Sequence, residues 1–256
     1  MPNLRYNGIE IAYLDEGAGQ PIVLLHRIAS NKVVDWVATQ WCATLRQAGR
    51  RVIAPDCRGH GASTKFYAPG DYTGVRMAAD VRALLDRVGI ERADLLGYEM
   101  GARVAAFFAA AHPARVRSLV LAGIGINLVE GSNREFRFAA ALEANPAQVI
   151  DPLERGIREF AERNQCDIKA VAACFRGARP LGREQLTAIQ VPTLVAVGTE
   201  DEIALREPNG DASIARGLAR LIPGAKALDI RGRDHFGAIA DPSFVRVVLE
   251  FLARRP

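Results

Sequence analysis

Short apolar runs alternate with longer amphipathic stretches along most of this chain. The runs are mostly bounded by glycine, proline or acid and lie at residues 21–26, 51–56, 93–98, 117–123, 191–198 and 225–230. Near-continuous apolar runs of this length are typical of strands buried on both faces. Helical spacing separates them at residues 33–48, 73–88, 102–112 and 240–254, so we expect right-handed crossovers and a mostly parallel sheet. Residues 9–15 alternate more loosely and are expected to add an antiparallel strand near one edge.

The interval from residue 127 to about residue 186 breaks this alternation. It contains no strand candidate, but NREFRFAAALEA and LERGIREFAERN carry apolar residues at three- and four-residue spacing. Such spacing is typical of amphipathic helices. We therefore predict an α/β core formed by residues 1–126 and 187–256. Residues 127–186 are expected to form a helical cap inserted after a core strand.

Composition limits the classes of partner. The net charge of +4 is modest and the basic residues are spread along the chain, so we expect neither nucleic-acid nor membrane binding. No signal peptide is expected, and no apolar run approaches the roughly 18 residues of a membrane span. The cysteines at positions 42, 57, 166 and 174 lack zinc or redox spacing and are expected to be reduced thiols in a cytoplasmic protein. No motif indicates a metal or cofactor, and we expect a monomer or homodimer that acts on a small molecule.

Residues 95–105, LLGYEMGARVA, run from a predicted strand through a glycine-flanked corner into a predicted helix. Gly97 and Gly101 would let the strand and the helix approach closely, and the central residue of such a corner is held in strained backbone geometry. The corner is therefore expected to direct Glu99 into a pocket rather than into the core.

This strand–GYEMG–helix unit resembles the nucleophile elbow of the α/β-hydrolase fold, whose central residue is usually serine. Four further segments resemble motifs of that family and come in its order: LLHRIAS, APDCRGHGAST, VAVGTEDEIA and RGRDHFGAI. The resemblance implies a mostly parallel eight-stranded sheet flanked by helices, with a small helical cap. It also implies that His235 is the catalytic base and that Asp201, rather than its neighbour Glu200, orients this histidine.

The resemblance places further residues around the reacting centre. The backbone N–H groups of Ile28 and Met100 would form the oxyanion hole, and His26 would shape the loop that carries Ile28. His26, Arg27 and Tyr98 are expected to line the pocket beside these groups. Arg27 stands where the family has glycine, which is one of two departures from its pattern.

The second departure is Glu99, which stands where the family usually has serine. A carboxylate at the elbow permits three chemistries. As a nucleophile it would attack a saturated carbon, and water activated by His235 would hydrolyse the resulting ester. However, the interval 127–186 has no tyrosine to protonate an epoxide oxygen, and Met100 stands where the family's dehalogenases usually have tryptophan. As a base or charge partner of His235, Glu99 would assist water attack on an ester or lactone. As the ion-pair partner of Arg27, it would define a protein without hydrolytic activity.

We expect hydrolysis of a small, mainly apolar substrate, such as an ester or lactone, with Glu99, His235 and Asp201 as the catalytic group. The main alternative is a non-hydrolytic ligand-binding homologue with an Arg27–Glu99 pair in its pocket. Epoxide opening, lyase chemistry and isomerase chemistry are further alternatives, and an engineered replacement of a serine is another reading of Glu99. The cap phenylalanines at positions 136, 138, 160 and 175 are expected mainly to pack the cap, with some lining the pocket.

Overall fold

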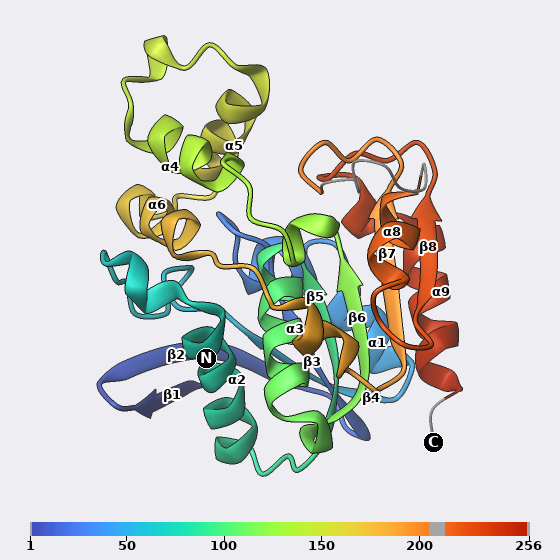
Figure 1. Ribbon diagram of the computed structural model, residues 1–256. Helices are drawn as coiled ribbons and strands as arrows, with labels where there is room; N and C mark the ends of the chain where they lie inside the picture. The colour runs from blue at the N-terminus through green and yellow to red at the C-terminus, as the bar shows by residue number, and fades with distance from the viewer. Residues whose placement is uncertain (1, 205–212, 255–256) are drawn as a thin grey trace.

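A central eight-stranded sheet organises the protein, shown as a computed structural model that describes residues 2–204 and 213–254 (Figure 1). The strand order is β1-β2-β4-β3-β5-β6-β7-β8. Strands β3 to β8 pair in parallel, whereas β1 pairs antiparallel with β2, and β2 with β4. The strands are β1 (Asn3–Tyr6), β2 (Ile9–Glu16), β3 (Gln20–Leu25), β4 (Arg50–Pro55), β5 (Ala93–Tyr98), β6 (Val116–Ala122), β7 (Thr193–Gly198) and β8 (Lys226–Ile230). The predicted mostly parallel eight-stranded sheet is confirmed.

Each apolar run predicted as a strand coincides with an observed strand to within two residues. The segment predicted at residues 9–15 is β2, and it lies next to the edge, as expected. The edge strand β1 was not predicted, because its four residues carry one buried side chain and so leave little pattern to detect.

Helices cover both faces of the sheet (Figure 1). The α-helices are α1 (Trp41–Gln47), α2 (Gly74–Arg87), α3 (Met100–Ala111), α4 (Arg134–Glu143), α5 (Pro152–Arg163), α6 (Ile168–Gly177), α7 (Arg183–Thr187), α8 (Ile214–Ala219) and α9 (Pro242–Ala253). Single turns of 3₁₀-helix lie at η2 (Pro69–Tyr72), η3 (Pro113–Arg115), η4 (Ile126–Leu128), η5 (Pro146–Gln148) and η6 (Ala238–Ala240). The predicted core range 187–256 includes residues 205–212, 255 and 256, which lie outside the described residues.

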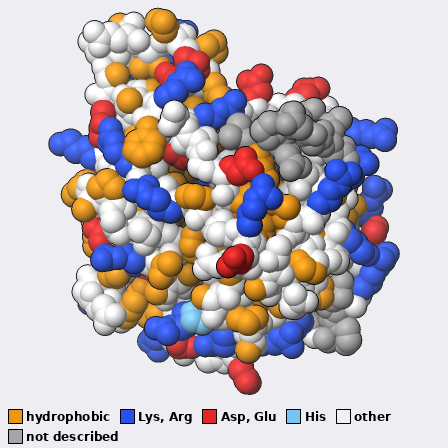
Figure 2. All heavy atoms as spheres, viewed as in Figure 1, with side chains coloured by type: hydrophobic (Ala, Val, Ile, Leu, Met, Phe, Trp, Pro, Cys, Tyr) orange, Lys and Arg blue, Asp and Glu red, His pale blue; other side chains and the backbone are white. Residues whose placement is uncertain are grey.

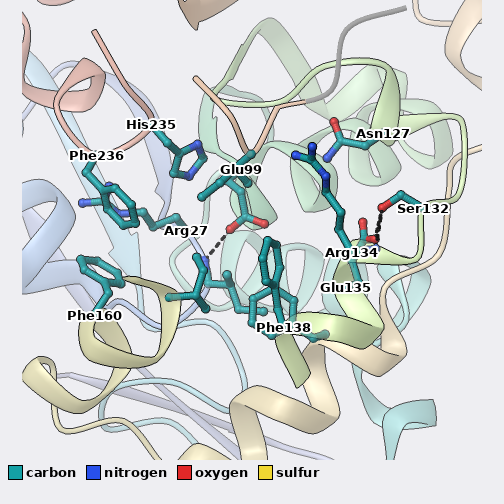
Figure 3. A pocket seen from close by; sticks show the side chains of 14 residues that line it. Arg27, Glu99, Asn127, Ser132, Arg134, Glu135, Phe138, Phe160, His235 and Phe236 are labelled. Carbon is teal, nitrogen blue, oxygen red and sulfur yellow. Dashed lines mark hydrogen bonds between the residues drawn. The ribbon is translucent and has the colours of Figure 1, made fainter. Parts of the chain in front are cut away.

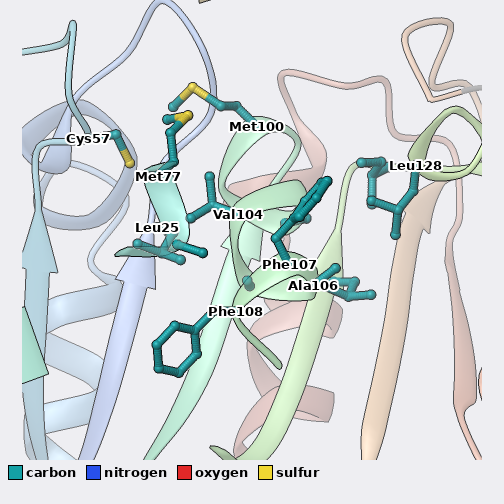
Figure 4. Close-up of a cluster of buried hydrophobic side chains, with 14 of the residues drawn as sticks. Leu25, Cys57, Met77, Met100, Val104, Ala106, Phe107, Phe108 and Leu128 are labelled. Atoms are coloured by element: carbon teal, nitrogen blue, oxygen red, sulfur yellow. The ribbon is translucent and has the colours of Figure 1, made fainter. Parts of the chain in front are cut away.

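Side chains that alternate along the central strands build two hydrophobic clusters, one on each face. On β3, for example, Val23 and Leu25 join the cluster that includes α2, α3 and α8, whereas Ile22 and Leu24 join the cluster formed with α1 and α9. Figure 4 shows α3 crossing the first cluster, where Val104 and its neighbours meet Leu25 of β3 and Met77 of α2. Because α3 is packed on the sheet from its first turn, the β5–α3 corner is fixed rigidly in place.

The stretch predicted as one helix at residues 33–48 is divided into two elements. It forms a short π-helix, η1 (Val33–Val37), and then α1 (Trp41–Gln47). Between them Gln40 adopts a left-handed backbone with φ 67°, which an α-helix cannot contain. The spacing therefore predicted helical structure correctly, but it did not predict that the helix is interrupted at Gln40.

The interval 127–186 is helical, and its described residues contain no strand. Helices α4, α5 and α6 lie together at the end of the sheet from which the β5–α3 corner projects (Figure 1). Helix α7, by contrast, returns to the core and contacts α3. A buried guanidinium joins the two parts, because Arg103 of α3 donates to the carbonyl of Asn127 (3.0 Å) and pairs with Glu135 of α4 (3.5 Å).

On the face shown in Figure 2, basic residues are interspersed with hydrophobic, acidic and uncharged groups. None of the helices in the described ranges is long and apolar enough to cross a bilayer. All four cysteines are free thiols, and three of them are buried.

Candidate active site

Glu99 alone joins β5 to α3, and its backbone is strained. Its dihedral angles are φ 49° and ψ −103°, a region that residues other than glycine rarely adopt. Both flanking positions require glycine, because neighbouring backbone atoms approach them closely. A Cβ atom on Gly97 would lie 2.2 Å from the carbonyl oxygen of Gly101, and one on Gly101 would lie 1.9 Å from that of Leu25. The strained corner predicted from the sequence is confirmed.

The carboxylate of Glu99 reaches back over the corner to the predicted oxyanion hole. Its Oε2 atom accepts a hydrogen bond of 2.8 Å from the backbone N–H of Ile28, drawn as the dashed line to Glu99 in Figure 3. The nearby backbone N–H of Met100 also favours the ionised form of this carboxylate. One of the two donors predicted to bind a substrate oxyanion, the N–H of Ile28, therefore binds the protein's own carboxylate in this structure.

Burial raises the pKa of Glu99 above its usual range. The imidazole of His235 and the backbone N–H groups of Ile28 and Met100 act in the opposite direction and offset only part of this effect. The side chain is half-buried, with part of it facing a cavity. A carboxylate held by backbone donors but poorly solvated is a stronger nucleophile and base than one in water.

His235 and Asp201 form the predicted pair. Oδ2 of Asp201 lies 2.9 Å from Nδ1 of His235, and both side chains are almost completely buried. Oδ1 of Asp201 accepts from the backbone N–H groups of Ile203 (2.9 Å) and Ala204 (2.8 Å), which fixes the carboxylate. Burial opposes ionisation of Asp201, but His235 and these hydrogen bonds prevail, so the pKa of Asp201 lies below its usual value. Since Nδ1–H donates to Asp201, Nε2 of His235 is left to act as a proton acceptor.

Two residues expected in the pocket lie beneath it instead. Tyr98 is fully buried; its hydroxyl donates to the backbone carbonyl of His235 (2.7 Å), and its ring packs edge-on against the imidazole. His26 is also fully buried, with Nδ1 donating to the carbonyl of Arg27 (2.7 Å) and Nε2 accepting from the N–H of Cys57 (2.9 Å). Neither residue lines a cavity with Glu99. The pocket assignment was therefore wrong for both, whereas His26 does hydrogen-bond the oxyanion loop as predicted.

The predicted Arg27–Glu99 pair is not formed. Nε of Arg27 instead donates to Oδ1 of Asp35 (3.0 Å), and the Arg27 backbone N–H donates to Oδ2 of the same carboxylate (2.9 Å). Asp35, which is fully buried in η1, also accepts from the hydroxyl of Ser30 (2.8 Å). Asp35 is therefore a better partner for Arg27 than Glu99 would be. It compensates the charge of the buried guanidinium, and its three hydrogen bonds also fix the oxyanion loop. The structure therefore contradicts the ligand-binding alternative that rests on an Arg27–Glu99 pair.

Glu99 and His235 line one cavity, which we call the Glu99 cavity (Figure 3). Its other polar lining residues are Arg27, Asn127, Ser132, Arg134 and Glu135, and its apolar ones are Ile28, Phe138, Ile157, Phe160, Phe175, Ile203 and Phe236. A smaller group of residues, including Met77 and Met100, surrounds a second cavity that also reaches Glu99. Three of the four phenylalanines of the helical interval thus line the Glu99 cavity, whereas Phe136 is exposed at the surface.

Asp35 and Phe236 are among the residues of this site that were not anticipated from the sequence. Asp35 lies within a stretch of helical spacing, and nothing in that stretch marks it as the partner of Arg27. Phe236 directly follows His235 and contacts both the imidazole and the ring of Phe160. Its position next to the predicted base was the signal that could have identified it.

Comparison with known proteins agrees with this architecture. A family model described as the alpha/beta hydrolase fold matches residues 20–150. The chain is 32% identical over 261 residues to 2-hydroxymuconate semialdehyde hydrolase of Pseudomonas putida, covering 93% of this chain and 89% of that protein. The chain therefore belongs to the α/β-hydrolase family.

Two further similarities concern different members of the family. The solved structure of the enol-lactonase from Burkholderia xenovorans LB400 matches with a TM-score of 0.79 and 25% identity, covering 98% of this chain and 100% of that chain. Epoxide hydrolase 3 of Siraitia grosvenorii is 33% identical over 118 residues, which cover 46% of this chain and 36% of that protein. The named relatives are hydrolases, so the fold and the hydrolase class are established, while the bond that is cleaved has to be inferred from the site.

Proposed function

We propose that this protein hydrolyses a small, mainly apolar substrate through a covalent ester on Glu99, with His235 as the base and Asp201 as its partner. The observation that carries this proposal is the hydrogen bond from the Ile28 N–H to Oε2 of Glu99. It holds one carboxylate oxygen in the oxyanion hole and leaves the other, Oε1, to react. This arrangement suits attack on a saturated carbon, because that step needs no oxyanion hole for the substrate.

The reaction proceeds in two steps. In the first, Oε1 of Glu99 bonds to the electrophilic carbon, and the leaving group departs with the electron pair of the broken bond. In the second, Nε2 of His235 takes a proton from water, whose oxygen attacks the carbonyl carbon of the Glu99 ester. Negative charge then develops on Oε2, which already accepts the hydrogen bond from the N–H of Ile28, and the N–H of Met100 is the second donor proposed for it. Collapse releases the alcohol, which receives the proton from His235, and returns Glu99 with one oxygen from water.

The helical interval 127–186 is proposed to act as the cap over this site. Phe138, Phe160 and Phe175 from its helices line the Glu99 cavity together with Phe236 from the core. Aromatic and aliphatic walls of this kind favour an apolar substrate and exclude water from the carboxylate.

Hydrolysis of an ester or lactone at its acyl carbon is the second candidate. The relatives named 2-hydroxymuconate semialdehyde hydrolase and enol-lactonase favour it, and so does the paired His235–Asp201 geometry. In this route a substrate carbonyl oxygen has to displace the Glu99 carboxylate from the N–H of Ile28. The covalent route requires no such displacement and is therefore preferred.

Trapping the ester tests the proposal. In a His235→Gln variant the first step is retained and the second is blocked, so incubation with an alkyl bromide or a terminal epoxide should add the mass of the organic group to Glu99. A Glu99→Gln/His235→Gln variant is the matched control and should stay unmodified. Absence of any adduct, combined with turnover of p-nitrophenyl acetate by the native protein that depends on His235, would establish the second candidate instead.

A further inference from the structure

Arg27 is a buried cation whose hydrogen-bonding capacity is largely unused. The residue is 5% exposed, and among the described residues only Nε of its guanidinium nitrogens has a hydrogen-bond partner, Oδ1 of Asp35. Neither terminal nitrogen donates to any residue in the described ranges, and Nη1 is completely buried without a partner. A guanidinium carries five N–H donors, and donors of a charged group that are buried without an acceptor are costly.

Three aromatic rings surround this guanidinium. Its central carbon lies 4.7 Å from the ring centre of Phe160, 5.4 Å from that of Phe236 and 5.7 Å from that of Tyr98. The rings stabilise the cation through their π faces, but they supply no lone pairs to the terminal N–H groups. The arrangement therefore holds a positive charge in an apolar setting and leaves its terminal N–H groups without an acceptor among the described residues.

These groups border the cavity that contains the proposed nucleophile. Arg27, Phe160 and Phe236 all line the Glu99 cavity together with His235. Figure 3 shows the guanidinium of Arg27 beside Phe236, on the side of the cavity opposite Arg134. We propose that the Arg27 guanidinium and its aromatic surround bind a small monovalent anion, either a halide or a carboxylate group, at this end of the cavity.

The chemistry of both anions suits the site. The terminal N–H groups of a guanidinium form a planar fork that matches a carboxylate, and the positive edges of aromatic rings favour a halide. The role of the anion rests on the proposed function: Glu99 attack releases a leaving group with its electron pair, and a leaving group that is stable as an anion needs no proton. The helical interval 127–186 contains no tyrosine that could supply one.

Anion binding can be measured without turnover. Sodium bromide and sodium acetate are titrated separately into the full chain by calorimetry, and crystals soaked in bromide are examined for an anomalous signal beside Arg27. We expect saturable binding of at least one of these anions and a signal at the guanidinium. Binding of bromide alone identifies a halide site, and binding of acetate alone identifies a carboxylate site.

A double variant tests the role of Arg27 without leaving a buried charge behind. Arg27→Gln/Asp35→Asn removes both members of the ion pair, and binding should weaken at least about tenfold, as expected for loss of a charged hydrogen bond. The matched control, Arg51→Gln/Asp15→Asn, removes a surface pair that is joined by two hydrogen bonds and should bind the anion unchanged. Circular dichroism verifies that both variants are folded.

Two results overturn the inference: no saturable binding of either anion, or equal binding by the native protein and the folded Arg27→Gln/Asp35→Asn variant. A Glu99→Gln variant separates this inference from the proposed function, because it cannot form the ester but keeps Arg27. Anion binding that persists in this variant, while no ester forms in the trapping experiment, leaves the anion site standing and rejects only the nucleophilic role.

Discussion

The backbone N–H of Ile28 donates a 2.8 Å hydrogen bond to Oε2 of Glu99, across 71 positions of sequence. Ile28 is held in place from below, because Asp35 binds both the backbone and the side chain of Arg27. Glu99 is held in place by the corner between β5 and α3. The oxyanion loop and the elbow thus meet through the carboxylate itself, and this contact determines what chemistry the site can perform.

Replacement of Glu99 by serine should convert the site into a conventional esterase. Serine is too short to reach the N–H of Ile28, so the oxyanion hole is opened while His235 and Asp201 remain paired. We predict that Glu99→Ser hydrolyses p-nitrophenyl acetate at least about 10²-fold faster than the native protein, with a burst of nitrophenol that marks an acyl-enzyme. Glu99→Ser/His235→Gln is the control and should lose the gain. A Glu99→Ser variant that is no faster than this control would show that the oxyanion hole does not support ester hydrolysis.

The raised pKa of Glu99 predicts a pH-dependent effect on stability. Because its folded pKa lies above the unfolded value of 4.5, the stability that this group contributes is complete below about pH 4.5 and is lost as the pH rises through the folded pKa. Glu99→Gln should therefore raise the Tm at pH 8 and leave it unchanged at pH 4. Calorimetry resolves this, since 1 kcal/mol corresponds to roughly 2–4 °C in a chain of about this size. An equal shift of Tm at both pH values would contradict the assignment.

Replacing glycine by alanine should have opposite effects at the crowded corner and at an open helical position. Gly101→Ala places a methyl group against the backbone carbonyl of Leu25, which cannot move without disturbing β3. It should lower the free energy of unfolding by about 3 kcal/mol or more. Gly156→Ala, in α5 with open space around it, should raise the free energy by about 0.5–1 kcal/mol. Denaturant titration measures both, and a neutral Gly101→Ala would contradict the packing described.

The sequence predicted the framework of the site because that framework follows from local rules. Two glycines at the end of an apolar run require a tight corner, and Glu99 adopts the strained geometry they predict. Asp201 and His235 were assigned from the resemblance to the family's motifs. Each follows a parallel strand, and the carboxyl ends of adjacent parallel strands lie at the same edge of a sheet, which is consistent with their meeting at 2.9 Å.

The partners of the two unusual residues were not predictable in the same way. Arg27 and Glu99 both have long side chains, and a sequence does not state the direction in which such a chain points. The choice between Glu99 and Asp35 as the partner of Arg27 depended on η1, whose irregular turn brings Asp35 under the oxyanion loop. The partner of the Glu99 carboxylate is the backbone N–H of Ile28. Backbone N–H groups are present in every sequence and leave no pattern that would predict this contact.

The most direct test of the account is the fate of oxygen in a single turnover. Native protein in excess over an alkyl bromide or terminal epoxide that it hydrolyses is allowed to react once in ¹⁸O-labelled water, and the peptide that contains Glu99 is then analysed by mass spectrometry. The account predicts one ¹⁸O atom in the Glu99 carboxylate and an alcohol product whose new oxygen carries no label. Label found only in the product, with none in the Glu99 peptide, would contradict the covalent role of Glu99.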